Sequence, residues 1–92
     1  MKIAVNTCFG GFCLDDQIAK KYGLDKYEVS RTDPKLIELI ESGIDVSPKS
    51  SYRKHPSIAL ITIPDEATDY RIFDYDGLES IIYVLDGKMY NA

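Results

Sequence analysis

The residue types best suited to hold a ligand are concentrated in one short segment, 47–56, with the sequence SPKSSYRKHP. This segment contains Lys49, Arg53 and Lys54 and no acidic residue, although the whole chain carries a net charge of −4. Lys and Arg form ion pairs with phosphate, and an adjacent aromatic ring can stack on a base. We therefore predict a site for a small anionic, nucleotide-like ligand. Its predicted residues are Tyr52, Arg53, Lys54 and His55, with Arg31 joining them from another segment. The alternative is a solvated loop that binds nothing.

A second candidate is the sequence NTCFGGF at 6–12. Gly10 and Gly11 allow positive φ, so the chain can turn here between a strand and a helix. Such a turn can present backbone N–H groups and a helix N-terminus to an anion. However, neither Walker A nor G-x-G-x-x-G is present, and the negative charges of Asp15 and Asp16 follow the turn. A tight turn between packed elements is the favoured interpretation, and Gly10 and Gly11 remain secondary ligand-binding candidates.

Catalytic and metal chemistry have little support in the sequence. The chain has two cysteines, Cys8 and Cys13, and its single histidine is His55. A nucleophilic cysteine needs a base to supply the thiolate, and no cysteine-enzyme signature is present. A structural zinc site needs four ligands, more than these residue types supply together. We therefore expect a non-enzymatic protein without metal or cofactor, in which both thiols stay reduced.

The charge of the C-terminal third is strongly negative. Residues 57–92 contain seven acidic residues, against Arg71 and Lys88 as the basic ones. Nucleic-acid binding rests on phosphate neutralisation, so we expect no direct contact with nucleic acid. Two interpretations remain open for the acidic surface: a solvated face, or a mimic of a polyanion that occupies a basic site on another protein.

Length and hydropathy predict one cytoplasmic domain. A chain of 92 residues makes at most one domain, here 1–92, with a thin core. No signal peptide is recognisable, and no apolar run approaches the ~20 residues of a membrane span. Seven tyrosines without a tryptophan are typical of packing at edges and interfaces, or of cross-strand pairs. The thin core and the tyrosines together favour a homo-oligomer.

The hydrophobic pattern predicts an α+β fold. Helices are expected from Asp15 or Asp16 to Tyr22, and from an Asp33 cap with Pro34 in its first turn to Gly43. Strands are expected at 2–7, 27–30, 57–63, 70–75, 79–85 and 88–90, the one at 57–63 being central and buried on both faces. The expected architecture is a small mixed sheet with a C-terminal antiparallel β-meander and two helices packed on one face.

Several segments resemble a group of small proteins encoded by bacteriophages and prophages. IAVNTCFGGF at 3–12 is similar to the INTxYGGFxLS start of that group, and DPKLIE at 33–38 resembles its DPxLIE helix start. IPD at 63–65 and YDGLE at 75–79 are similar to its IPDD and YDGxE segments. Leu14-Asp15 replaces the usual Leu-Ser of the first motif. The resemblance implies a phage origin and an accessory role, and it assigns no functional residue.

Three hypotheses follow for the function. The first is a homo-oligomeric binder that sequesters a small anionic ligand in counter-defence. The second is an acidic inhibitor that binds a host defence protein through its C-terminal face. The third, an enzyme, is the weakest because no nucleophile, base and orienting group are visible together.

Overall fold

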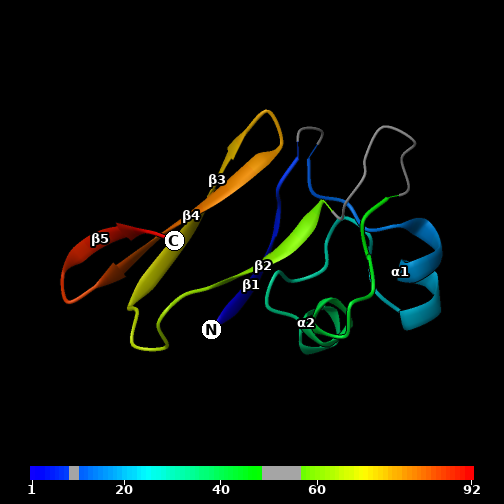
Figure 1. Ribbon diagram of the computed structural model, residues 1–92, viewed down its shortest axis with the longest axis horizontal. Helices are drawn as coiled ribbons and strands as arrows, with labels where there is room; N and C mark the ends of the chain where they lie inside the picture. The colour runs from blue at the N-terminus through cyan, green and yellow to red at the C-terminus, as the bar shows by residue number, and fades with distance from the viewer. Residues whose placement is uncertain (9–10, 49–56) are drawn as a thin grey trace.

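The structure, a computed structural model, describes residues 1–8, 11–48 and 57–92. Within these ranges the chain forms two helices and two antiparallel sheets (Figure 1). The elements in chain order are β1 (Lys2–Asn6), α1 (Asp16–Tyr22), α2 (Pro34–Glu41), β2 (Ile58–Thr62), β3 (Asp69–Tyr75), β4 (Leu78–Leu85) and β5 (Lys88–Asn91). β1 pairs with β2, and β3, β4 and β5 form the meander. The α+β class, the meander and both helices are confirmed, whereas the described strands divide between two antiparallel sheets rather than one mixed sheet.

β1 lies between two hydrophobic clusters because its side chains alternate in direction. Ala4 points toward the helices and belongs to a cluster with Leu36 of α2. Ile3 and Val5 point the opposite way and belong to a second cluster with Ile81 of β4. The helices therefore cover one face of the β1–β2 sheet, and the meander packs on the other (Figure 1).

Local capping chemistry sets the ends of the helices, as the sequence predicts. The carboxylate of Asp15 accepts hydrogen bonds from the first turn of α1, and Gly23 ends that helix with a φ of 68°. Asp33 accepts from the first turn of α2 in the same way, directly before Pro34. These side chains satisfy backbone donors that have no partner within the helix.

The expected strand at 27–30 is wrong. The carboxylate of Asp25 accepts from the backbone N–H groups of Glu28 (2.8 Å) and Tyr27 (3.0 Å), and the Asp25 carbonyl accepts from the N–H of Val29 (3.2 Å). These bonds close a turn that replaces extended structure. They also lower the pKa of Asp25 below its usual value, the bond from Glu28 contributing most.

The expectation that 57–63 forms a central strand is also wrong. Within the described residues, β2 pairs with β1 alone and is an edge strand. Its residues are apolar on both faces because Ile58 packs with the helix-side cluster and Ile61 with the meander-side cluster. A strand with both faces covered has the same apolar sequence pattern as a central strand. A strand is central, however, only when it pairs with another strand along each of its two edges.

Two tight turns build the meander. Asp76 and Gly77 have φ values of 52° and 90°, and Asp86 and Gly87 have φ values of 52° and 77°. Asp-Gly tolerates this left-handed conformation at both central turn positions, which suits a hairpin. The two Asp-Gly pairs therefore form the turns that connect the strands of the predicted meander.

Candidate functional site

A hydrogen-bonded junction joins the end of β1 to the start of β2. The carbonyl of Ser57 accepts from the N–H (2.6 Å) and the hydroxyl (2.9 Å) of Thr7. The hydroxyl oxygen of Ser47 accepts from the N–H groups of Ser57 (3.0 Å) and Ile58 (2.9 Å). Ser47 and Ser57 are both buried. We call Thr7, Ser47 and Ser57 the serine junction.

The serine junction joins described residues that flank the two ligand-binding candidates of the sequence, 49–56 and the glycine turn. Ser47 and Ser57 lie just outside the two ends of 49–56, the range that contains the predicted basic residues. Thr7 precedes the glycine turn, and the Asn6 side chain donates to the carbonyl of Cys8 (2.6 Å) at the same end of β1. The described residues that flank 49–56 and the glycine turn therefore lie at adjacent points of the fold.

The predicted ligand residues divide between described and undescribed parts of the chain. Gly11 is described and has a φ of 87°, a conformation that glycine adopts without strain. Arg31 is described as well. The other predicted residues, Gly10, Tyr52, Arg53, Lys54 and His55, lie outside the described residues.

The guanidinium of Arg31 is held by a carboxylate. Its two terminal nitrogens donate to the two carboxylate oxygens of Glu79 on β4, at 2.5 and 2.8 Å. The ring of Phe12 lies 3.6 Å from the guanidinium carbon. Such a two-pronged pair is a strong and directional interaction. An anionic ligand at Arg31 would have to displace Glu79, and the ligand role of Arg31 stays a prediction.

Arg31 and Glu79 also cover the edge of β1 that does not pair with β2. The backbone N–H of Ala4 donates to the carbonyl of Arg31 (2.8 Å), and the Ala4 carbonyl accepts from the Arg31 side chain (3.3 Å). The N–H of Asn6 donates to Glu79 (2.7 Å). An open strand edge is a template for unwanted pairing, so this cover protects β1.

Sequence reasoning missed the structural role of Glu79. The side chain of Glu79 is 4% exposed, against 24% for that of Arg31. A signal for it exists in β4, where Glu79, Ile81 and Tyr83 alternate along the face that packs on the core. An acidic residue at such a position requires a cationic partner, although the spacing alone does not identify Arg31.

The remaining ion pairs of the described residues also neutralise positively charged groups. Besides Arg31, three lysines bind carboxylates, in the pairs Lys2–Glu41, Lys26–Asp16 and Lys35–Glu38. The amino group of Met1 pairs with Asp65 at 2.5 Å, which lowers the pKa of that carboxyl. These pairs neutralise Lys2, Lys26, Arg31 and Lys35, whereas Lys20 and Lys21 lie exposed beside each other in the last turn of α1.

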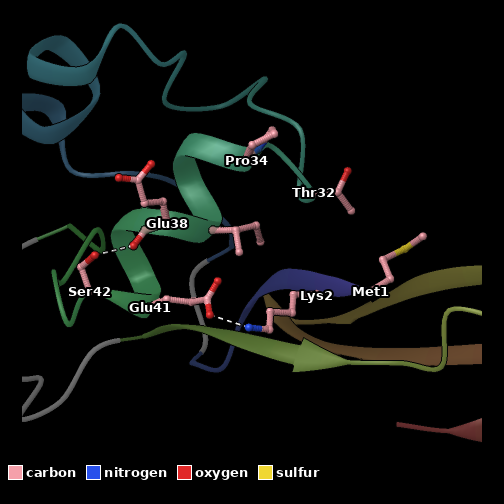
Figure 2. A pocket seen from close by; sticks show the side chains of 8 residues that line it. Met1, Lys2, Thr32, Pro34, Glu38, Glu41 and Ser42 are labelled. Atoms are coloured by element: carbon pink, nitrogen blue, oxygen red, sulfur yellow. Dashed lines mark hydrogen bonds and ion pairs between the residues drawn. The ribbon is translucent and has the colours of Figure 1, made fainter.

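A groove of about 650 Å³ lies between the start of β1 and α2 (Figure 2). Glu38 and Glu41 project from α2, and Lys2 reaches Glu41 from β1. The Ser42 hydroxyl donates to the Glu38 carbonyl (2.8 Å), so its proton is already engaged. The groove has the carboxylates of Glu38 and Glu41, and its two cations, Lys2 and the Met1 amino group, already bind carboxylates, which does not suit the anionic ligand predicted from the sequence.

Metal and thiol chemistry gain no geometric support in the described ranges. No group of three or more His, Cys, Asp or Glu residues lies close enough there to hold a metal ion. Cys8 and Cys13 are free and partly buried, and the Cys13 thiol contacts the Leu14 carbonyl at 3.4 Å. None of the helices described here has the length and apolar character needed to cross a membrane.

The chain matches no protein-family model, no curated protein and no solved structure.

Proposed function

We propose that the protein is a non-enzymatic accessory protein of a bacteriophage or prophage, and that it binds a small anionic, nucleotide-like ligand as a homo-oligomer in counter-defence. The observation that carries the proposal is the serine junction. Because Ser57 is hydrogen-bonded to both Thr7 and Ser47, the described residues that flank 49–56 and the glycine turn lie side by side. Cationic side chains and the N–H groups of a glycine turn are complementary ways of holding an anion.

The charge distribution supports the same assignment. The basic residues outside 49–56 are outnumbered by acidic ones, and several already bind carboxylates. An anion approaching this protein is therefore repelled from most of its surface and attracted to Lys49, Arg53 and Lys54.

The test is ligand binding by native mass spectrometry and calorimetry, with cyclic nucleotides and ADP-ribose derivatives as probes. Arg53→Ala combined with Lys54→Ala is expected to weaken binding at least about tenfold, since two charge-assisted contacts are lost. The matched control is Lys20→Ala with Lys21→Ala, which removes the same charge from exposed positions on α1 and should leave affinity unchanged. Equal affinity in both double variants would show that the basic segment does not hold the ligand.

A second candidate function is an acidic inhibitor of a host defence protein. The turns of the meander favour it, because Asp74 and Asp76 lie exposed at one end and Asp86 at the other. Binding through these carboxylates should weaken steeply with salt. A pull-down from host lysate tests this, and failure to recover any partner at low salt would count against it.

A further inference from the structure

The outward face of the meander carries apolar side chains that nothing in the described chain covers. Residues of β3 alternate, so that Tyr70 and Ile72 pack in the meander-side cluster while Arg71 and Phe73 point away from it. Phe73 is 46% exposed and Met89, on β5, is 70% exposed. We call this outward side of the meander the outer face. β1 packs on the opposite side, and no described helix lies beside the outer face (Figure 1).

A groove of about 300 Å³ is cut into the outer face. Phe73, Ile82, Val84 and Met89 form its apolar part, and Asp69 and Arg71 stand beside them. Aromatic residues, methionine and arginine are the types enriched at protein interfaces. The outer face therefore has the composition of a contact surface.

We propose that the outer face binds a second copy of this chain in a two-fold symmetric dimer. The reason is the charge on β3, where Asp69 and Arg71 are two residues apart and face the same side. In a two-fold interface each contact occurs twice, so Arg71 of one copy can pair with the partner's Asp69 and the reverse. A patch that is neutral and self-complementary suits an identical copy better than a basic protein, which would select carboxylates alone.

The outer face is small for a protein interface. β4 is the longest strand of the meander at eight residues, which gives a length of about 26 Å, and three strands span about 14 Å. This is a few hundred Å² per copy, below the roughly 800 Å² per partner of a standard stable interface. A contact of this size is typical of transient association, which is to be sought at micromolar to millimolar concentrations.

This inference deepens the proposed function by naming the contact between copies, and it is tested without any ligand. Sedimentation velocity from about 1 µM to about 1 mM should show a monomer–dimer equilibrium. Phe73→Ser should weaken association at least about tenfold, as expected when a large aromatic residue is removed from the apolar lining of the groove. Tyr27→Ser is the matched control, because Tyr27 is 64% exposed but lies outside the meander. Monomer at every concentration, or a dimer that Phe73→Ser leaves intact, would overturn the proposal.

A charge exchange gives the sharpest version of the test. Asp69→Arg and Arg71→Asp should each weaken self-association, because each puts like charges opposite one another across the two-fold axis. An equimolar mixture of the two variant chains should recover dimers, since opposite charges then face each other. A mixture that stays as monomeric as its components, with folding verified by circular dichroism, would contradict the predicted pairing. Ligand titrations of Phe73→Ser separate this result from ligand binding, which the proposed function assigns to 49–56.

Discussion

At the scale of single residues, the Arg31–Glu79 pair connects three parts of the chain that are distant in sequence. The pair joins the segment before α2 to β4, and both residues also bond to the backbone of β1. A buried ion pair is not by itself strong evidence of net stabilisation, because removing charges from water is costly. Its clear effect is positional: it fixes where the edge of β1 lies relative to the meander.

Removal of one partner of this pair is therefore expected to destabilise the fold strongly. Glu79→Ala takes the carboxylate from the Arg31 guanidinium and the acceptor from the Asn6 N–H, which should lower the free energy of unfolding by about 3–5 kcal/mol. A domain of this size has roughly 5–14 kcal/mol in total, so the variant should be near the limit of folding. Urea denaturation measures the loss.

Two further variants show which property of the Glu79 side chain causes that loss of stability. Glu79→Gln keeps one oxygen that can accept from the Asn6 N–H and from one Arg31 nitrogen, so it should lose less than Glu79→Ala, although its NH2 group cannot accept from the other Arg31 nitrogen. Glu66→Ala, which removes an exposed carboxylate, should leave stability almost unchanged. If Glu79→Ala proved as stable as Glu66→Ala, the pair would have no role in holding β1.

The residues that sequence reasoning could find are those recognised by their neighbours in the chain. The positive charge of 49–56 is visible because Arg53 and Lys54 are adjacent and no acid interrupts them. Glu79 was missed because its partner Arg31 is 48 residues away. The serine junction was missed for the same reason, since a serine hydroxyl as acceptor for a distant backbone has no sequence signature.

At the scale of elements, helices were predictable because their signals are local. Asp33 and Pro34 mark the start of α2 within two residues, and Asp-Gly marks each turn of the meander. Strand position was not predictable, because β2 has the apolar pattern of a central strand but pairs at one edge. The 27–30 segment failed because the side chain of Asp25 competes for the backbone donors that a strand would use.

The serine junction makes a prediction about the connection between β1 and β2. Ser47→Ala removes the acceptor of two buried N–H groups, those of Ser57 and Ile58. Leaving buried donors unsatisfied should cost about 1–3 kcal/mol, which lowers the melting temperature by roughly 4–8 °C per kcal/mol in a domain of this size. Thermal unfolding followed by circular dichroism measures the shift.

The matched control is Ser42→Ala. The Ser42 hydroxyl donates to the Glu38 carbonyl at an exposed helix end, where water can replace it. The melting temperature of this variant should stay close to that of the unmodified protein. If Ser42→Ala and Ser47→Ala shifted the melting temperature equally, the hydrogen bonds to the buried Ser47 hydroxyl would not stabilise the fold more than the exposed bond of Ser42.

At the scale of the whole molecule, the arrangement of β1 decides whether the chain unfolds as one unit. The helix-side cluster contains Ala4, and the meander-side cluster contains Ile3 and Val5. Neither cluster can lose its packing without disturbing a strand that the other needs. Small domains with such shared elements generally unfold in a single cooperative transition.

Cooperativity of this kind can be tested with two equivalent substitutions, one in each cluster. Ile58→Val removes a buried methylene from the helix-side cluster, and Ile81→Val removes one from the meander-side cluster. Each should lower the free energy of unfolding by about 0.5–1.5 kcal/mol without unfolding the protein.

If β1 couples the two clusters, Ile81→Val lowers the opening free energy of the amides in α2 as much as that of the amides in β4. Ile58→Val likewise lowers the opening free energy in β4 as much as in α2. Native-state hydrogen exchange measures both effects, at concentrations low enough to keep the chain monomeric. If Ile81→Val left the amide exchange rates of α2 unchanged, the meander would open on its own while the helices and the serine junction stay folded.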